Sequence, residues 1–190
     1  MNRREQILDT AAELFARHGF HGVSIADLGA ACGVTGPALY KHFRGKQANL
    51  AAMLVGISEE LLSEGRRRVR AAADDGAALE ALIAWHVSFA LEHEALIVVQ
   101  DRDWAALPVE AREKVRETQR KYVEVWVKVL RGLHPELQPR AARAMVHATF
   151  GLINSTPHSA LVPAEEMAGL LSRMARSALL GQSSLATSSS

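Results

Sequence analysis

The chain of 190 residues has a single cysteine, almost no net charge and no long hydrophobic run. Cys32 has no second cysteine with which to form an internal disulfide, and we interpret it as a small apolar core side chain in preference to a redox sensor. The formal net charge of +1 argues against a polybasic surface. No apolar run approaches the ~18 residues of a membrane span. Acidic residues interrupt the N-terminal segment, so we do not expect a signal peptide. With neither a signal peptide nor a membrane span, we expect a cytoplasmic location.

Motifs for catalysis and cofactor binding are also missing. The sequence contains no P-loop, no glycine-rich dinucleotide turn and no serine elbow. His86, His93, Asp101 and Asp103 lie near one another in the sequence, but no pair among them has HExxH, ExxH or CxxC spacing. We therefore expect a protein that is not an enzyme and that needs no metal or cofactor.

The remaining composition is that of an ordinary globular chain, with 48% hydrophobic and 23% charged residues. No segment alternates convincingly as a strand would, whereas apolar residues recur at helical spacing and are punctuated by turn signals. The sequence therefore predicts an all-α fold. Beyond residue 45 the predicted helices are 46 to about 72, 76–93, 95 to about 105, 109–133, 139–154 and 163–180. The first of these is long enough to act as a lever between two domains.

Residues 24–43, SIADLGAACGVTGPALYKHF, have the pattern of two short helices around a tight turn. Ser24 and Asp27 form a capping-box arrangement, which predicts a helix beginning at Ile25. Gly33 provides the residue that tolerates a positive φ where the chain turns. A preceding amphipathic helix, ended by Gly19, would brace this pair. The three helices together predict a helix-turn-helix head, which is a structure that enters the DNA major groove.

The second helix of this motif carries its polar residues on the outer side. Thr35 is its expected N-cap, and small residues in its first turn permit close approach to DNA. The helix N-terminus and the side chains of Tyr40 and His42 can donate to phosphate oxygens, and Lys41 can reach a phosphate or a base edge. By themselves these side chains would be an ordinary solvated face; the caps and the turn favour DNA binding. The predicted DNA contacts are Ser24, Thr35, Gly36, Pro37, Tyr40, Lys41, His42 and Lys46.

Most aromatic residues outside the head lie in the middle of the chain, with polar side chains near them. They could line a cavity between helices, where ligands often bind in helical bundles. Core packing is the alternative, and for each single aromatic residue it is the more common role. The candidate ligand-binding residues are Trp85, His86, Phe89, Arg102, Trp104, Tyr122, Trp126, His147, Phe150 and Asn154.

The segment from about Arg4 to Leu50 resembles the DNA-binding domain of the tetracycline-repressor (TetR) family. The matching positions are Ala31, Gly33-Val34-Thr35, Tyr40-Lys41-His42-Phe43 and Lys46. Asn49 departs from the pattern, because leucine is commoner there. The resemblance implies a DNA-binding domain over 1–61, a helical effector-binding and dimerisation domain over 62–180, and leaves a serine-rich tail over 181–190 that we expect to be disordered.

The resemblance further implies a homodimer formed through the last two helices, which carry small and apolar residues on one side. It implies a repressor that binds a palindromic DNA operator and is released by a small effector, for which the aromatic lining favours an apolar or amphipathic molecule such as an acyl thioester. The alternative is a helical small-molecule-binding protein whose head contacts a protein partner. The sequence does not identify the effector, the operator bases or the regulated genes. It also does not determine whether the protein represses or activates transcription, or whether one or two dimers bind each operator.

Overall fold

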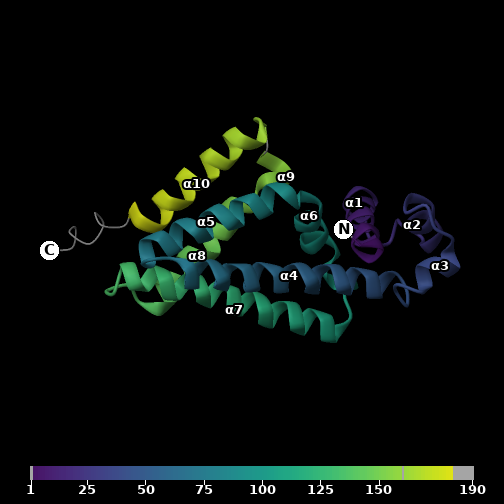
Figure 1. The fold of residues 1–190 in the computed structure, drawn as a ribbon, viewed down its shortest axis with the longest axis horizontal. Coiled ribbons are helices and arrows are strands. Elements are labelled where there is room, and N and C mark those ends of the chain that lie inside the picture. The colour runs from purple at the N-terminus through teal and green to yellow at the C-terminus, as the bar shows by residue number, and fades with distance from the viewer. Residues whose placement is uncertain (1, 160, 182–190) are drawn as a thin grey trace. The chain divides into compact units, whose positions relative to one another are not determined.

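The computed structural model describes residues 2–159 and 161–181, and every regular element in those ranges is a helix, as the all-α prediction requires (Figure 1). From residue 182 onward, the tail predicted to be disordered lies outside the described residues. The elements are α1 (Arg3–His18), α2 (Ile25–Ala31), α3 (Gly36–Tyr40), α4 (Lys46–Ala71), α5 (Asp75–Glu92), α6 (Glu94–Asp103), the 3-10 turn η1 (Trp104–Ala106), α7 (Val109–Leu133), α8 (Pro139–Ile153), α9 (Thr156–Ser159) and α10 (Ala164–Leu180).

Within the described residues, no helix taken singly is both long and apolar enough to cross a membrane. The consecutive helices α5 and α6, extended to Ala106, reach that length and hydropathy only when they are counted together.

The described residues form two compact units. The head unit comprises the described part of Met1–Glu60 together with Ala95–Thr118. The body unit comprises Leu61–Glu94 and the described residues from Gln119 onward. The head unit therefore contains most of α6 and the first turns of α7 in addition to the segment 1–61 predicted as the DNA-binding domain.

The head begins with capped helices. Asn2 caps α1 in a capping box with Glu5, and Ser24 caps α2 in the predicted box with Asp27. Gly33 adopts the predicted positive φ, at +64°, between α2 and α3. The predicted starts of α2 and α4, at residues 25 and 46, are confirmed.

The core of the head draws on α1 to α4 and on residues from α6 and α7. Val99, Leu107 and Val115 are almost completely buried in the same cluster as the helix-turn-helix side chains. The buried members from the first 60 residues are Ile7, Ala11, Ala12, Phe15, Phe20, Val23, Leu28, Leu39, Phe43, Leu50, Met53 and Leu54.

Asn49 lies inside this head with only 1% of its surface exposed. Neither its amide nitrogen nor its amide oxygen has a hydrogen-bond partner among the described residues. Leu50, the next residue, is fully buried in the same core. The departure at Asn49 therefore places an unpaired polar group where the pattern usually has leucine, and this costs free energy of folding.

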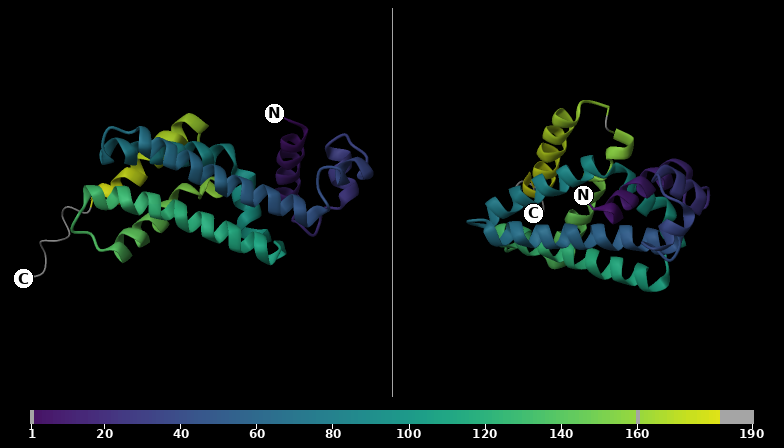
Figure 2. Two further views of the ribbon diagram at one scale, coloured as in Figure 1. Left: turned by 60° about the horizontal axis from the view of Figure 1, so that its bottom comes forward. Right: turned by 45° about the vertical axis from the view of Figure 1, so that its right-hand side comes forward.

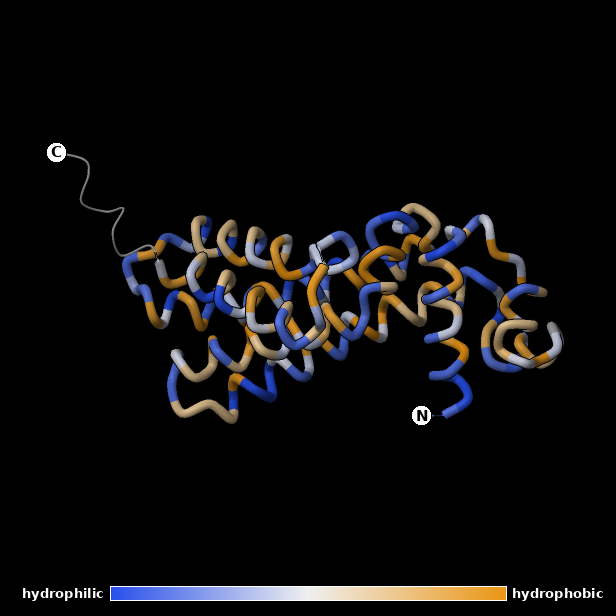
Figure 3. Tube along the Cα trace, turned by 90° about the horizontal axis from the view of Figure 1, so that it is seen from above, coloured by the Kyte–Doolittle hydropathy of each residue, from blue (hydrophilic) through white to orange (hydrophobic). Residues whose placement is uncertain are grey.

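In the body unit, α10 packs against α5 and α8 (Figures 1 and 2). Hydrophobic and hydrophilic residues alternate along the helices in Figure 3, as expected for helices with one buried side. The short α9 was not predicted. Thr156, its first residue, is buried and donates from its hydroxyl to the carbonyl oxygen of Ala90 in α5 (2.9 Å), which ties α9 to the bundle.

Candidate functional site

The outer side of α3 is exposed as the sequence predicts. Tyr40 is 54% exposed despite its large ring, and Lys41 and His42 are exposed after it. Leu39 and Phe43 turn inward and are buried in the head core. The motif therefore presents hydrogen-bond donors outward on a helix anchored by its apolar side.

The N-terminal ends of α2 and α3 differ in how their caps are used. The hydroxyl of Ser24 is engaged within α2, because it accepts from the backbone N–H of Asp27 and donates to the Asp27 carboxylate (2.6 Å). This hydrogen bonding holds the pKa of Asp27 below its usual range. Thr35 is the N-cap of α3 but its side chain makes no capping hydrogen bond. Gly36 and Pro37 form the first turn, so the start of α3 retains free backbone N–H groups.

Lys46 is directed into the head. Its ammonium group donates to the carbonyl oxygens of Phe20 (2.6 Å) and Val23 (2.7 Å), and it lies 4.3 Å from the centre of the Phe20 ring. Two of its three N–H donors are thus used within the head unit. We predicted Lys46 as a DNA contact, and the structure gives it a structural task that the sequence motif does not reveal.

Arg44 is a cation that the sequence interpretation passed over. It is exposed and lines a surface cleft of about 570 Å³ at the start of α4, together with His21, Lys46 and Gln47. The first backbone N–H groups of α4 point toward its N-terminal end, where they attract anions. The signal that could have found Arg44 is its position one residue before the glycine that precedes α4.

Eight of the ten candidate ligand-binding residues belong to the body unit, and seven of them form a group centred on His86. The imidazole of His86 stacks on Phe150 (ring centres 4.4 Å apart) and lies parallel to the ring of Tyr122 (5.7 Å). Trp126 meets it edge-on at 5.9 Å. Phe89 also contacts this ring, at 6.2 Å.

His86 is 2% exposed, and both of its ring nitrogens have partners. Nε2 lies 3.1 Å from the side-chain oxygen of Asn154, and Nδ1 lies 3.3 Å from the hydroxyl of Tyr122. Because the Asn154 oxygen can only accept, Nε2 carries the proton and Nδ1 accepts from Tyr122. Burial lowers the pKa of His86 to about 4 and raises the pKa of Tyr122, so both side chains are uncharged.

Trp85 is half-buried at the edge of this group. The guanidinium of Arg68 lies 5.1 Å from its ring centre, and Glu64 pairs with Arg68 at 2.9 Å. A cation over an indole ring is attracted by the electrons of the ring face. Arg68 was not among the predicted ligand-binding residues.

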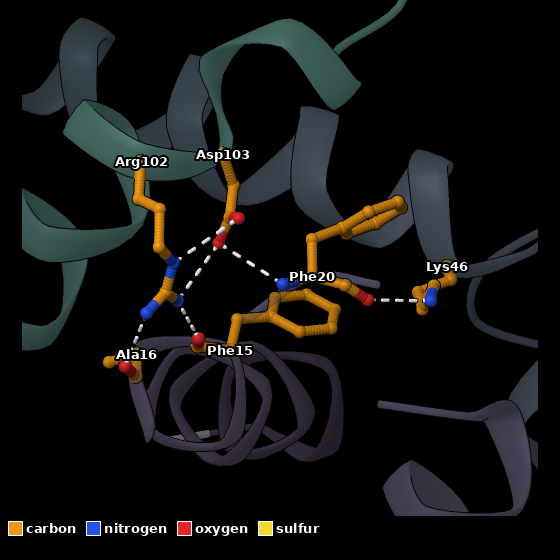
Figure 4. A network of polar contacts seen from close by, with 6 residues as sticks. All are labelled: Phe15, Ala16, Phe20, Lys46, Arg102 and Asp103. Atoms are coloured by element: carbon orange, nitrogen blue, oxygen red, sulfur yellow. Dashed lines mark hydrogen bonds and ion pairs between the residues drawn. The ribbon is translucent and has the colours of Figure 1, made fainter. Parts of the chain in front are cut away.

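Three candidate ligand-binding residues are not part of this group. Arg102 and Trp104 belong to the head unit, where Arg102 binds backbone carbonyls of α1 (Figure 4) and Trp104 lies under the guanidinium of Arg116 (5.4 Å). His147 is in the body unit but is exposed on α8. Trp104 was selected as an aromatic residue of the middle of the chain, and Arg102 and His147 as polar residues near the aromatic residues. Arg102 and Trp104 belong to the other unit, and His147 lies on the exposed side of α8.

Two protein-family models match the chain. Residues 7–53 match the model described as bacterial regulatory proteins, tetR family. Residues 72–158 match the model described as tetracyclin repressor-like, C-terminal domain. Together the two matches span more than half of the chain.

A relative and two solved structures agree with these matches. The HTH-type transcriptional repressor KstR2 of Rhodococcus jostii is 30% identical over 129 residues, which are 67% of this chain and 63% of that protein, so less than two thirds of its length is covered. A TetR-family transcriptional regulator from Bordetella parapertussis superposes with a TM-score of 0.84 at 25% identity, covering 95% of this chain and 96% of that one. FadR of Bacillus subtilis, solved in complex with stearoyl-CoA, has a TM-score of 0.71 at 19% identity, covering 92% and 98%, and shows the same fold.

Proposed function

Because this chain belongs to the TetR family of bacterial regulatory proteins, we propose that it is a homodimeric DNA-binding regulator of transcription. It represses by binding a palindromic operator and leaves the operator when a small effector binds its body unit. It acts in the cytoplasm, where the DNA is, and it is not an enzyme. The observation that carries the proposal is the outward side of α3, where donors stand exposed on a helix whose opposite side is locked in the core.

The exposed residues divide into two groups by chemistry. Tyr40, His42 and the free N–H groups at the start of α3 donate to phosphate oxygens, and Lys41 reaches a phosphate or base edge. Arg44 and the first turn of α4 add a second anion-binding point. Phosphate contacts fix the orientation of the helix, and base contacts supply the discrimination.

Dimerisation is supported by an exposed apolar side on the last long helices. Leu170 and Met174, one helical turn apart on α10, are 38% and 45% exposed. On α8 the residues at positions 141, 144, 148 and 151 are alanines and a glycine, and all four are exposed. Small residues allow two copies of this face to approach closely. A two-fold dimer presents two recognition helices to two half-sites, which one short helix cannot read.

The proposed effector is an amphipathic molecule such as an acyl thioester. The support is the aromatic and neutral character of the body interior around His86, and the FadR structure, in which the protein is bound to stearoyl-CoA. The aromatic group is closely packed, so a ligand must separate some of its rings to bind there. An effector releases DNA only if it binds the operator-free conformation more tightly than the bound one.

The test is a gel shift with duplex DNA from the region flanking the protein's own gene. We expect a band at submicromolar protein that weakens steeply with salt, because phosphate contacts release counterions. Tyr40→Ala should weaken the band without changing helical content or dimerisation. Lys128→Ala, a control at an exposed position of α7 in the body unit, should leave the band unchanged. Absence of a salt-sensitive band up to micromolar wild-type protein contradicts the proposal.

A further inference from the structure

Helix α6 completes the C-terminal end of α1 (Figure 4). If α1 continued beyond Gly19, the backbone N–H of Phe20 would donate to the carbonyl oxygen of Ala16. Gly19 ends the helix with a φ of +76°, which leaves both of these groups without a helical partner. Arg102 donates from Nη1 to the Ala16 carbonyl oxygen at 3.0 Å, and Asp103 accepts the Phe20 N–H at 3.2 Å.

The two side chains act together. Arg102 also donates from Nη2 to the carbonyl oxygen of Phe15, and the same nitrogen lies 3.1 Å from Oδ2 of Asp103. Asp103 is only 7% exposed, and its carboxylate pairs with the neighbouring guanidinium. A cation at this position also interacts favourably with the C-terminal end of the α1 dipole. The pair therefore replaces one lost main-chain hydrogen bond with a charged bridge.

The turn that follows is held from a second direction. Lys46, the first residue of α4, donates to the carbonyl oxygens of Phe20 and Val23, whereas Asp103 accepts from the N–H of Phe20, so side chains from two helices bind both main-chain groups of Phe20 (Figure 4). The ring of Phe20 packs against Phe15, with centres 5.4 Å apart. Residues 19–23 are thus fixed by side chains from α6 and α4, and they lead directly into Ser24, the cap of α2.

We propose that Arg102 and Asp103 are positioning residues for DNA recognition. They touch no DNA in this scheme; they fix the direction in which the chain leaves α1 and enters the helix-turn-helix. This inference rests on the proposed DNA-binding function. It also makes α6 a structural part of the DNA-binding head, so the helix-turn-helix requires residues 95–118 as well as the N-terminal segment.

The first experiment measures amide hydrogen exchange by mass spectrometry on the full-length protein. Asp103→Asn and Arg102→Met should speed exchange of peptides covering residues 15–24. Peptides from α5 and α8 in the body unit should remain unchanged. Arg176→Met is the matched control, because it removes the ion pair between Arg176 and Glu80, which joins two helices of the body unit. Unchanged exchange over 15–24 in both test variants overturns the proposed bridge, whether or not the protein binds DNA.

The second experiment measures affinity for the gene-flanking duplex used above, at a temperature where circular dichroism shows every variant folded. Arg102→Met should weaken binding at least about tenfold, equivalent to about 1.4 kcal/mol. Arg102→Lys should recover part of the loss, because one ammonium keeps the charge but cannot match the planar fork. Arg176→Met should bind as wild type does.

The outcomes separate the two proposals. If the wild type gives no salt-sensitive band, the regulatory function fails, and the positioning role for DNA fails with it, while exchange still decides whether the bridge exists. If the wild type binds and Arg102→Met binds equally well, the positioning role is overturned even where exchange has risen. If Arg102→Met does not fold, Arg102→Lys and Asp103→Asn are judged by the same two criteria.

Discussion

The head and body units differ in the side chains that hydrogen-bond to their polar groups. In the head, charged side chains, Arg102, Asp103 and Lys46, bind main-chain groups left open at a helix end and a turn. In the body, the interior network of His86, Tyr122 and Asn154 is uncharged and links side chain to side chain. Arg102 is 42% exposed at its side chain, so water shares the cost of its charge, whereas His86 is excluded from water. The charged network in the head pairs the nearly buried Asp103 with a half-exposed arginine, whereas the neutral network in the body is buried at its central ring, His86.

The largest effect should come from the neutral interior of the body. Trp126→Ala removes a side chain with no exposed surface and leaves a cavity among the stacked rings. We expect the free energy of unfolding to fall by about 3 to 5 kcal/mol. Urea denaturation monitored by circular dichroism measures this, and Trp104→Ala, at a half-buried site in the head unit, should cost less. Equal losses for the two variants would contradict the contrast in packing.

The next effect tests the uncharged state of His86. The pKa of His86 is about 4 in the folded protein, below the ordinary value of 6.5. Above pH 6.5 the imidazole is therefore neutral in both the folded and the unfolded chain, and its protonation takes nothing from the free energy of unfolding. Below pH 6.5 His86 becomes protonated in the unfolded chain but stays neutral in the folded protein, so the free energy of unfolding decreases until about pH 4. The total loss should be about 3 kcal/mol.

Urea denaturation at pH 7, 6, 5 and 4 measures this loss. His86→Gln keeps a donor and an acceptor but does not titrate, so its stability should depend less on pH than that of the wild type. The same pH dependence in both proteins would mean that His86 is not held neutral in the body.

A smaller effect is expected where the head breaks its own rule. Asn49 is buried like the body residues, but its side-chain amide has no hydrogen-bond partner among the residues that the structure describes. Asn49→Leu should raise the free energy of unfolding by about 1 to 2 kcal/mol, because a similar volume is filled without an unpaired amide. Thermal unfolding measures this change. A loss of stability would show that the amide has a function in the head.

The smallest effect should come from an exposed ion pair in the body. Arg176 of α10 donates from Nε to Glu80 of α5 at 2.6 Å, and both side chains are nearly half exposed. Arg176→Met should change the free energy of unfolding by less than about 1 kcal/mol, since water screens such pairs. Added salt should not increase the difference in the free energy of unfolding between Arg176→Met and the wild type. A cost well above about 1 kcal/mol would contradict the expectation that water screens this exposed pair.

Much of the head could be predicted from local sequence because its signals act over a few residues. The Ser24 cap, the Gly33 turn, the inward Leu39 and the outward Tyr40 each follow from spacing within one or two helical turns, and each is found. The helices of the body were located to within one or two residues for the same reason. The short α9 was missed; a contact that fixes it, from Thr156 to Ala90 of α5, joins residues 66 positions apart and is invisible to local patterns.

The candidate sites show where local reasoning ends. His86, Tyr122 and Phe150 were selected as aromatic and nearby polar residues of the middle of the chain, and their rings do lie together. No local pattern assigned Lys46 to two carbonyl oxygens or Arg102 to the end of α1. Sequence proximity placed Arg102 with the aromatic residues of the body. The DNA contacts and the ligand contacts remain predictions.

The sequence by itself determined the all-helical fold, the family and the outward side of α3, because caps, turns and periodicity are encoded over short spans. Tertiary structure alone decided that α6 closes the end of α1, that Lys46 faces inward and that His86 is neutral. Those properties depend on which distant groups are brought within hydrogen-bond range and on how much water they keep. Short-range patterns in the chain do not contain that information.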